Sequence, residues 1–183
     1  MSSLLRFAGV TLRRGGRLLF EGLELELGPG DALQIAGPNG SGKSSLIRLA
    51  AGLLSADEGT IERSSLALAD DNVALDRELS LVRALGFWVR EPDQAISAAG
   101  LSSVRDVPVR WLSSGQLKRA AIARVIGSCA PLWLLDEPLN ALDREGADLL
   151  SKHVARHLAG GGAVLAASHQ PLPGEWRRIE LTA

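Results

Sequence analysis

The sequence predicts an α/β fold with a parallel core sheet, an antiparallel β portion near the N-terminus and a short helical insertion. The parallel sheet is predicted by two observations. The continuous apolar runs 132–135 and 163–167 are typical of central strands that are covered on both faces. Between them, residues 144–159 carry apolar side chains at helical spacing and end at a run of glycines. Such alternation of strand and helix indicates an α/β fold.

The chain begins with strands of a different kind. Residues 23–27 alternate strictly between leucine and glutamate, which predicts a half-buried strand. The glycine- and proline-rich residues 28–31 then turn the chain. Residues 4–12 form a weaker strand candidate. An antiparallel edge is therefore expected before the parallel core.

Residues 37–44 match the phosphate-binding pattern GxxxxGK[ST]. A predicted strand, 32–36, comes before this loop, and a predicted helix, 45–51, follows it and ends at a glycine. Glycines let backbone N–H groups turn towards phosphate oxygens, and the positive end of the helix points at the same anion. We expect Lys43 to reach the β and γ phosphates of a nucleotide and the Ser44 hydroxyl to bind Mg²⁺.

The middle of the chain has another pattern. Between about 64 and 110, residues 79–89 and 92–99 look helical, without a strong strand between them. A small helical insertion is therefore expected to lie off the sheet. Phe87 and Trp88 within it are interpreted as core residues, with a docking site for a partner as the alternative.

Composition bounds the class of protein. A length of 183 residues predicts one domain, 1–183, with a core at about 1–63 and 111–183 and the helical insertion at about 73–110.

The charge and the apolar pattern exclude several classes of partner and location. The net charge of −1 argues against nucleic acid as a partner. Neither a signal-peptide pattern nor a membrane-spanning apolar run is found, so we expect a cytoplasmic chain. The lone Cys129 is expected to be a small buried residue, neither nucleophile nor ligand.

Residues 112–116, with the sequence LSSGQ, begin a predicted helix. Ser113 and Gln116 have capping-box spacing, and an apolar stripe follows, with Lys118, Arg119 and Arg124 placed on other faces. Taken alone, this pattern also fits an ordinary well-capped helix. Its position after a phosphate loop and before a strand that ends in two acids favours a role in nucleotide binding.

Asp136 and Glu137 follow the apolar run that ends at residue 135. The carboxyl ends of parallel strands form the edge where ligands of α/β folds bind. There the Asp136 carboxylate can hold Mg²⁺, and Glu137 is placed to orient or deprotonate a water that attacks the γ-phosphate. A solvated strand end is the alternative, and the phosphate loop upstream favours the catalytic roles. Trp133, within the strand, is interpreted as core.

On these motifs the chain resembles the ATP-binding cassette (ABC) family over essentially its whole length. Residues 37–44 resemble the Walker A loop of that family, 112–116 its signature, 132–137 its Walker B strand, 140–143 its D-loop and His169 its switch histidine. The resemblance implies a P-loop NTPase that hydrolyses ATP with Mg²⁺. It also implies a head-to-tail dimer, in which the signature of one copy closes on the ATP held by the other, and integral membrane permease subunits as partners.

The resemblance also implies the site residues. Catalysis is assigned to Lys43, Glu137 and His169, and the metal to Ser44 and Asp136. The residues that would bind the nucleotide are Gly37, Pro38, Asn39, Gly40, Ser41, Gly42, Lys43, Ser44, Ser45, Ser113, Ser114, Gly115, Gln116 and Asp143.

The sequence departs from the family pattern in two places. In the family, a glutamine that helps to bind Mg²⁺ and senses the membrane partner usually follows the strand before the helical insertion. Here residues 66–69 stand in the place of that strand, the glutamine is missing, and Asn72 or Asp71 must replace it. The aromatic residue that usually stacks on adenine is also missing. Arg13 and Arg14 stand in its place, and an arginine plane or Phe20 is left as the stacking partner.

His153 and His157 lie four residues apart on one predicted helix and would both be able to bind a metal. No third ligand accompanies them, so a solvated helix face is favoured. None of the histidines lies in a haem-binding pattern.

Within the family, the short length, the brief insertion and the C-terminal residues 168–172 and 177–179 resemble the ATP-binding subunits of cytochrome c maturation systems, or haem exporters. This resemblance implies a peripheral location on the inner face of a bacterial cell membrane and ATP turnover linked to haem handling or release of a haem chaperone. The alternatives are the ATPase subunit of an unrelated ABC importer or exporter, a soluble ABC ATPase without a membrane partner, and a nucleotide-gated module that hardly hydrolyses ATP.

Overall fold

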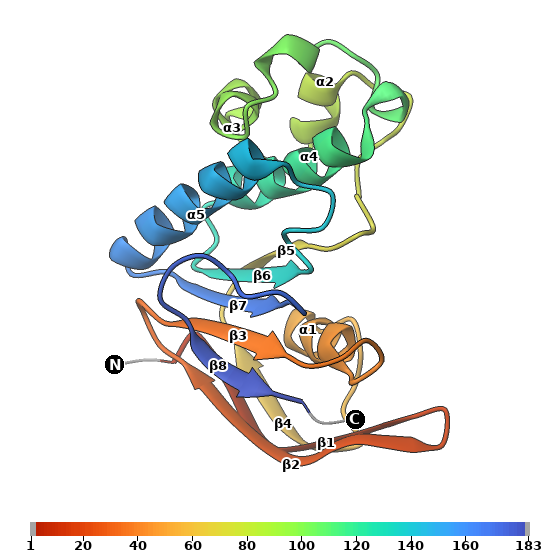
Figure 1. Cartoon of the computed structure of the whole chain (residues 1–183), viewed down its shortest axis with the longest axis vertical. Helices are drawn as coiled ribbons and strands as arrows, with labels where there is room; N and C mark the ends of the chain where they lie inside the picture. Colours follow the sequence, from red (N-terminus) through yellow and green to blue (C-terminus); the bar gives the residue numbers. More distant parts are fainter. Residues whose placement is uncertain (1–2, 182–183) are drawn as a thin grey trace.

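The computed structural model describes residues 3–181 and arranges them as two β-sheets with helices between and outside them (Figure 1). The smaller sheet is antiparallel, with the strand order β2-β1-β4. Its strands are β1 (Leu5–Arg14), β2 (Arg17–Leu27) and β4 (Glu58–Arg63). At the end of β2, Leu25 and Leu27 are buried and the glutamates between the leucines are exposed, which confirms the predicted half-buried strand.

The larger sheet is parallel, with the strand order β5-β6-β7-β3-β8. Its strands are β3 (Ala32–Ala36), β5 (Leu66–Ala69), β6 (Leu132–Asp136), β7 (Ala163–Ala167) and β8 (Arg177–Glu180). Every residue of β7 is buried, as expected for a central strand covered on both faces. Because the strands are parallel, their carboxyl ends meet at one edge of the sheet, and the candidate site lies along that edge.

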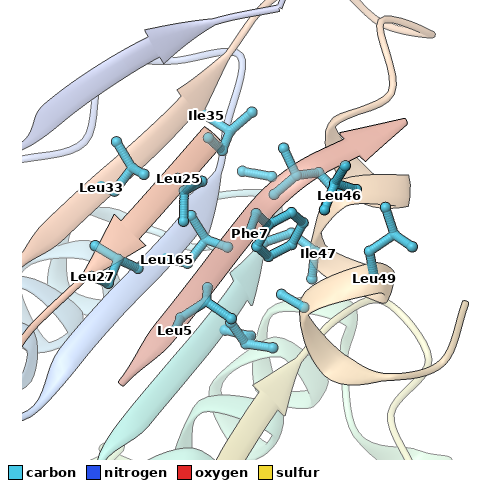
Figure 2. Packing of buried hydrophobic residues seen from close by; sticks show 14 of the residues in the cluster. Leu5, Phe7, Leu25, Leu27, Leu33, Ile35, Leu46, Ile47, Leu49 and Leu165 are labelled. Carbon is cyan, nitrogen blue, oxygen red and sulfur yellow. The ribbon is translucent and has the colours of Figure 1, made fainter. Parts of the chain in front are cut away.

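Helix α1 (Lys43–Ala51) packs between the two sheets. Figure 2 shows the ring of Phe7, from β1, beside Leu46 and Ile47 of α1 and close to the leucines of neighbouring strands. These three side chains are at most 1% exposed, so they fix α1 and the loop before it against the sheet. The helix ends at Gly52, whose φ of 74° suits glycine, as the sequence predicted.

Helices α4 (Ser114–Gly127) and α5 (Arg144–Ala159) cover the opposite face of the parallel sheet (Figure 1). Val125 of α4 and Leu150 of α5 pack with Trp133 and Val164 from the strands, and Trp133 is a core residue as predicted. The longest helix, α5, has 16 residues. Across residues 3–181, no helix has both the length and the apolar character needed to span a bilayer.

The helical region lies beyond the sheet and forms a small core together with Ala120 and Ala123 of α4 (Figure 1). It consists of α2 (Leu81–Leu85), α3 (Pro92–Ala98) and the 3₁₀ turns Ser102–Val104 and Val109–Trp111. Helix α2 is shorter than predicted from 79–89. Leu79 instead accepts a backbone hydrogen bond from Val109, and the helix ends at Gly86.

β5 pairs with β6 inside the parallel sheet, at residues 66–69, where the family resemblance placed a strand before the helical insertion. The helical region therefore begins after this strand and not from about residue 64. With only four residues, two of them alanine, β5 has a weak sequence pattern. β4 and β8 were missed because most of their side chains are polar and exposed.

Several side-chain interpretations are also corrected. Cys129 is exposed, in the turn between α4 and β6, with a left-handed φ of 55°. Phe87 and Trp88 are 78% and 51% exposed, because α2 ends before them, so the core interpretation is wrong. His157 does not lie on a solvated face, since its ring stacks on Trp133 with the ring centroids 3.9 Å apart.

Candidate functional site

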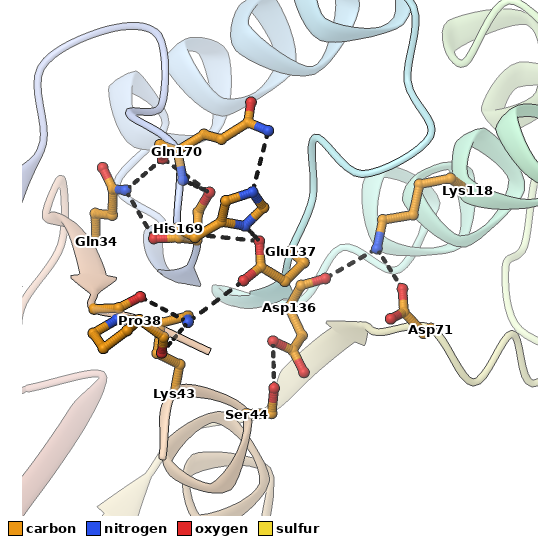
Figure 3. A network of polar contacts seen from close by, with 12 residues as sticks. Gln34, Pro38, Lys43, Ser44, Asp71, Lys118, Asp136, Glu137, His169 and Gln170 are labelled. Atoms are coloured by element: carbon orange, nitrogen blue, oxygen red, sulfur yellow. Dashed lines mark hydrogen bonds and ion pairs between the residues drawn. The ribbon is translucent and has the colours of Figure 1, made fainter. Parts of the chain in front are cut away.

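Four segments that follow parallel strands meet at the carboxyl edge of the larger sheet. They are the phosphate loop after β3, the segment 70–72 after β5, Asp136 and Glu137 at the end of β6, and residues 168–170 after β7. Figure 3 shows side chains from all four segments joined by polar contacts. Residues far apart in the sequence thus form one continuous site.

Lys43 is the buried centre of the phosphate loop. Its side chain is 5% exposed, and its Nζ donates hydrogen bonds to the main-chain oxygens of Gly37 and Pro38 at 2.9 and 3.0 Å (Figure 3). Gly37 has a φ of 141°, and a Cβ there would lie 2.5 Å from the Leu181 oxygen. The tight curvature of the loop at this point therefore requires glycine.

The loop has the features needed to hold a nucleotide phosphate. The Ser41 hydroxyl is buried and, within residues 3–181, has no hydrogen-bond partner. Gly42 caps the N-terminus of α1 without a side chain, and the first turn of the helix carries no acid. The first N–H groups of a helix have no acceptor within it, so these donors and the Lys43 ammonium fit an anion. Of the other loop residues, Pro38, Asn39 and Gly40 are exposed and Ser45 is buried.

Ser44 and Asp136 are held close together. The Ser44 hydroxyl donates to Oδ1 of Asp136 at 3.1 Å (Figure 3). Neighbouring oxygen ligands of an octahedral Mg²⁺ are also about 3 Å apart, so this pair fits the metal. Burial raises the pKa of the Asp136 carboxyl, and the negative charges of Asp71 and Glu137 add to this, whereas the Ser44 hydrogen bond opposes it. A cation at this point would relieve the cost of the buried carboxylate.

Glu137 lies between Lys43 and His169. Its Oε1 is 3.7 Å from Lys43 Nζ, and its Oε2 is 2.8 Å from His169 Nδ1. The Glu137 backbone adopts a left-handed φ of 45° and donates to the Ala167 oxygen at the end of β7. A non-glycine residue in this conformation is strained, and the contact with β7 holds it in place. The carboxylate is thereby directed at the phosphate loop.

The imidazole of His169 is oriented from both sides. Nδ1 contacts Glu137, and Nε2 lies 3.2 Å from the side-chain nitrogen of Gln170. This arrangement fits the tautomer in which Nδ1 donates to the carboxylate and Nε2 accepts from the amide. The ring therefore supports the orientation of Glu137.

Gln34 fixes the turn that carries His169, and sequence analysis missed it. This β3 side chain is 3% exposed and donates to the main-chain oxygens of Ser168 and Gln170 at 3.3 and 2.7 Å (Figure 3). Its oxygen accepts from the Leu172 N–H at 3.4 Å. The sequence does carry one signal for this role, because Gln34 is a polar residue in the middle of an apolar central strand.

The segment after β5 contacts α4 through a lysine. Lys118, which the sequence placed on a polar face, is buried and donates to Asp71 Oδ1 at 3.1 Å and to the Asp136 main-chain oxygen at 2.9 Å. Within residues 3–181, no hydrogen bond or ion pair involves Asn72. Of the two residues proposed to replace the family glutamine, the structure thus engages Asp71, through Lys118.

The predicted capping box at the start of α4 is confirmed. The Ser113 N–H donates to the Gln116 side chain at 2.9 Å, and the Gln116 N–H donates to the Ser113 hydroxyl at 3.2 Å. The N–H groups of Ser114 and Gly115 have no acceptor within the helix. A hollow of about 320 Å³ lies beside this helix start, lined on its other sides by Val104, Ala141 and their neighbours.

Asp143 belongs to this second surface. It caps α5, its Oδ1 accepting from the Gly146 N–H at 2.9 Å and from Arg119 at 2.5 Å. These hydrogen bonds, the Gly146 one foremost, lower the pKa of the Asp143 carboxyl. A Cβ on Gly115 would lie 2.9 Å from the oxygen of Ala141, whose φ is 63°. The D-loop residues thus pack on the start of α4.

The two groups of predicted nucleotide-binding residues lie apart in one chain. The phosphate loop precedes α1 on one face of the parallel sheet, and the residues at the start of α4 lie towards its other face (Figure 1). Within residues 3–181, no hydrogen bond or ion pair joins residues 37–44 to residues 113–116. The two groups are therefore separate surfaces in one chain.

Of the residues proposed to stack on adenine, Phe20 is buried in the core between the sheets. Its ring is 9% exposed and is therefore not free to stack on a base. Arg13 and Arg14 are exposed near the tip of the β1–β2 hairpin. That hairpin runs beside the phosphate loop, since a Cβ added to Gly42 would lie 3.4 Å from Cβ of Leu19.

Comparison with known proteins identifies the family. The model of the ABC transporter family matches residues 20–140. A cytochrome c biogenesis ATP-binding export protein CcmA from Sphingopyxis alaskensis is 52% identical over 177 residues, which cover 92% of this chain and 91% of that protein. The protein of the same name from Pseudomonas putida is 40% identical over 205 aligned positions, covering 99% of this chain and 98% of that protein.

Solved structures share the fold. An inward-facing ABC transporter of metal-chelate type matches with a TM-score of 0.79 and 26% identity, over 93% of this chain and 75% of that one. A dimeric ATP-binding cassette bound to ADP and phosphate matches with a TM-score of 0.80 and 20% identity, over 91% of this chain and 88% of that one. The chain is thus an ATPase of the ABC transporter family and belongs to its group of cytochrome c biogenesis ATP-binding export proteins.

Proposed function

We propose that this chain powers a haem-handling ABC complex, as its ATP-hydrolysing subunit on the inner face of a bacterial cell membrane. The observation that carries the proposal is the meeting of Lys43, Ser44, Asp136, Glu137 and His169 at one sheet edge. The names of the relatives, which describe export proteins of cytochrome c biogenesis, support the choice of haem.

The roles of the residues follow from their contacts. Lys43 and the N–H groups of the phosphate loop bind the β and γ phosphates of ATP. Ser44 and Asp136 hold Mg²⁺, which neutralises phosphate charge when it is bound. Glu137 orients the attacking water and accepts its proton, and His169 keeps the Glu137 carboxylate in place.

A second copy of this chain completes the site. The start of α4 offers the first N–H groups of the helix, those of Ser114 and Gly115, and a positive helix end beside a hollow. Within the described residues 3–181, however, no hydrogen bond or ion pair joins it to the phosphate loop. If two copies pair head to tail, these donors reach the γ-phosphate held by the partner. ATP then links the copies, and Asp143 lies at the same interface.

The aromatic surface of the helical region is proposed to contact the membrane subunits. Phe87 and Trp88 are exposed, and the Trp88 ring stacks on the guanidinium of Arg124 at 4.7 Å. Arg124 also donates to the Leu68 oxygen in β5 at 2.7 Å, and Leu68 lies two residues before the segment 70–72. A partner bound to this surface would therefore be coupled to the carboxyl edge of the sheet through Trp88, Arg124 and Leu68.

The alternatives differ in testable ways. An unrelated ABC importer or exporter would use the same edge with other membrane subunits. A soluble ABC ATPase would need no membrane subunit, and a nucleotide-gated module would hydrolyse little ATP. The contact between Glu137 and His169 favours hydrolysis over the last of these.

The test is replacement of the gene in its host by variants, with covalent haem on c-type cytochromes as the readout. Deletion of the gene should abolish haem attachment, the wild-type gene should restore it, and Lys43→Ala should not. Purification of the complex from membranes should then recover integral subunits together with haem-stimulated ATPase activity. Normal cytochrome c maturation in the deletion strain would reject the haem assignment, while ATPase activity in the purified complex would still support the cassette chemistry.

A further inference from the structure

Lys118 is a buried lysine whose contacts all lead to the metal edge of the site. Its Nζ donates to the main-chain oxygen of Asp136 at 2.9 Å and to Asp71 Oδ1 at 3.1 Å (Figure 3). Its side chain is 5% exposed, and an ammonium buried without such partners would be strongly destabilising. Lys118 therefore depends on these acceptors and in turn restrains them.

Asp136 is consequently held at both its main chain and its side chain. Its Oδ1 accepts from Ser44, while its carbonyl accepts from Lys118. Because Ser44 lies in the first turn of α1 and Lys118 belongs to α4, helices on the two faces of the sheet both hold Asp136. The position of the carboxylate thus depends on Lys118, although Lys118 lies outside the Ser44–Asp136 pair.

Asp71 differs from Lys118 in its exposure to solvent. Its side chain is 81% exposed, and it lies in the segment after β5. With Asp71 in place, the lysine charge is balanced close to Asp136. Without it, the lysine charge remains beside the metal position and opposes a cation there.

We propose that Lys118 is a positioning residue for the Mg²⁺ ligand Asp136, and that Asp71 acts as the counter-ion of Lys118, not as a metal ligand. This inference rests on the proposed function, because it takes Ser44 and Asp136 to be the metal ligands. In this arrangement, the segment after β5 is linked to the metal through Asp71, Lys118 and Asp136. This link does not require the glutamine that the family usually has there.

The first experiment measures metal binding and nucleotide binding separately in the full chain. Mn²⁺ binding in the presence of ATP is followed by electron paramagnetic resonance, and ATP binding in EDTA by calorimetry. Lys118→Met should weaken Mn²⁺ binding about tenfold, as loss of a residue that orients a metal ligand typically does, and leave ATP binding in EDTA unchanged. Lys118→Arg should keep most of the Mn²⁺ affinity. Lys152→Met, which alters an exposed lysine of α5, should behave as wild type.

The second experiment tests the ion pair. Asp71→Asn should weaken Mn²⁺ binding about threefold in the wild-type chain and have no further effect in a chain that already carries Lys118→Met. Asp70→Asn, which removes the neighbouring carboxylate, is the matched control and should leave Mn²⁺ binding unchanged. Since Asp71 is exposed, Asp71→Asn should fold, and wild-type Mn²⁺ affinity in this variant would overturn the inference even if Lys118→Met does not fold.

Three results would overturn the inference. One is wild-type Mn²⁺ affinity in Lys118→Met or in Asp71→Asn. Another is an equal loss of ATP binding in EDTA, which would assign Lys118 a purely structural role. The third is an equal effect of Asp71→Asn in both backgrounds, which would make Asp71 a direct metal ligand. Failure of the wild-type chain to bind ATP in a metal-dependent way would reject the proposed function instead.

Discussion

Lys43 Nζ lies 3.7 Å from Glu137 Oε1, so the ammonium expected to hold the phosphates is paired with the carboxylate expected to orient the attacking water. Both side chains are largely buried, at 5% and 15% exposed. In this arrangement, Lys43 also donates to main-chain oxygens of the phosphate loop. Phosphate oxygens compete for the same ammonium, so nucleotide binding is expected to release Glu137 for the water.

Glu137→Gln separates binding from hydrolysis. The amide keeps the shape of the carboxylate but cannot accept a proton, so turnover should fall about 10²- to 10⁴-fold. ATP binding should persist, because Lys43 and the loop N–H groups remain. A closed dimer should therefore accumulate with ATP, measured by light scattering on a sizing column. Unaltered turnover would contradict the role assigned to Glu137.

Lys43→Ala removes the ammonium at the centre of the loop. Loss of this phosphate contact should lower turnover at least about 10²-fold, since electrostatic stabilisation of phosphoryl transfer is lost. ATP binding should weaken as well, which calorimetry would measure. Lys152→Ala, on the exposed face of α5, is the control and should retain wild-type activity. Normal ATPase activity in Lys43→Ala would exclude the loop from the chemistry.

The local patterns of the site were predictable from the sequence because each motif needs particular residues next to one another. The segment 37–44 follows β3 and ends in the first turn of α1, the capping box forms at Ser113, and two acids end a buried strand. Each of these depends on neighbouring residues and on the preference of buried strands for apolar side chains. Such features are visible in a single sequence.

The residues that hold the site together were not predictable in the same way. Gln34, Lys118 and His157 find their partners 134, 18 and 26 residues away in the chain, through contacts that only the folded topology creates. Helical periodicity placed Lys118 on a polar face, because it cannot show that another segment covers that face. Polar edge strands such as β4 and β8 could not be predicted for a related reason. Their pairing with a neighbouring strand defines them, and their amino-acid composition does not.

Gln34→Leu tests the support of the turn that carries His169. The substitution removes the amide that contacts Ser168, Gln170 and Leu172, and should lower the free energy of unfolding by about 1–3 kcal/mol because buried polar groups lose their partners. ATP turnover should fall with it. Urea unfolding and an ATPase assay would measure the two effects.

The control for Gln34→Leu is Gln94→Leu, at an exposed position of α3. It makes the same chemical change without removing a buried hydrogen bond, and stability should change little. Equal stability and activity in the two variants would mean that the Gln34 contacts are not needed for the site.

His157 predicts a pH dependence of stability. Burial lowers the pKa of its imidazole below the ordinary value of 6.5, while the ring stacks on Trp133 and its Nε2 contacts the Pro131 oxygen. As the pH falls through about 6.5, the unfolded chain binds a proton more readily than the folded chain does. The contribution of His157 to stability is therefore complete above this range and is lost progressively below it.

Thermal unfolding between pH 7.5 and 5.5 measures this contribution. His157→Phe keeps an aromatic ring against Trp133 but removes the titrating group, so its melting temperature should fall less over this range than that of the wild type. His153→Gln removes a histidine from the same helix while leaving His157 in place, and should keep the wild-type slope. Because the comparison uses slopes and not absolute stabilities, the lost hydrogen bond to Pro131 does not confound it. Equal slopes in His157→Phe and wild type would show that protonation of His157 is not coupled to unfolding.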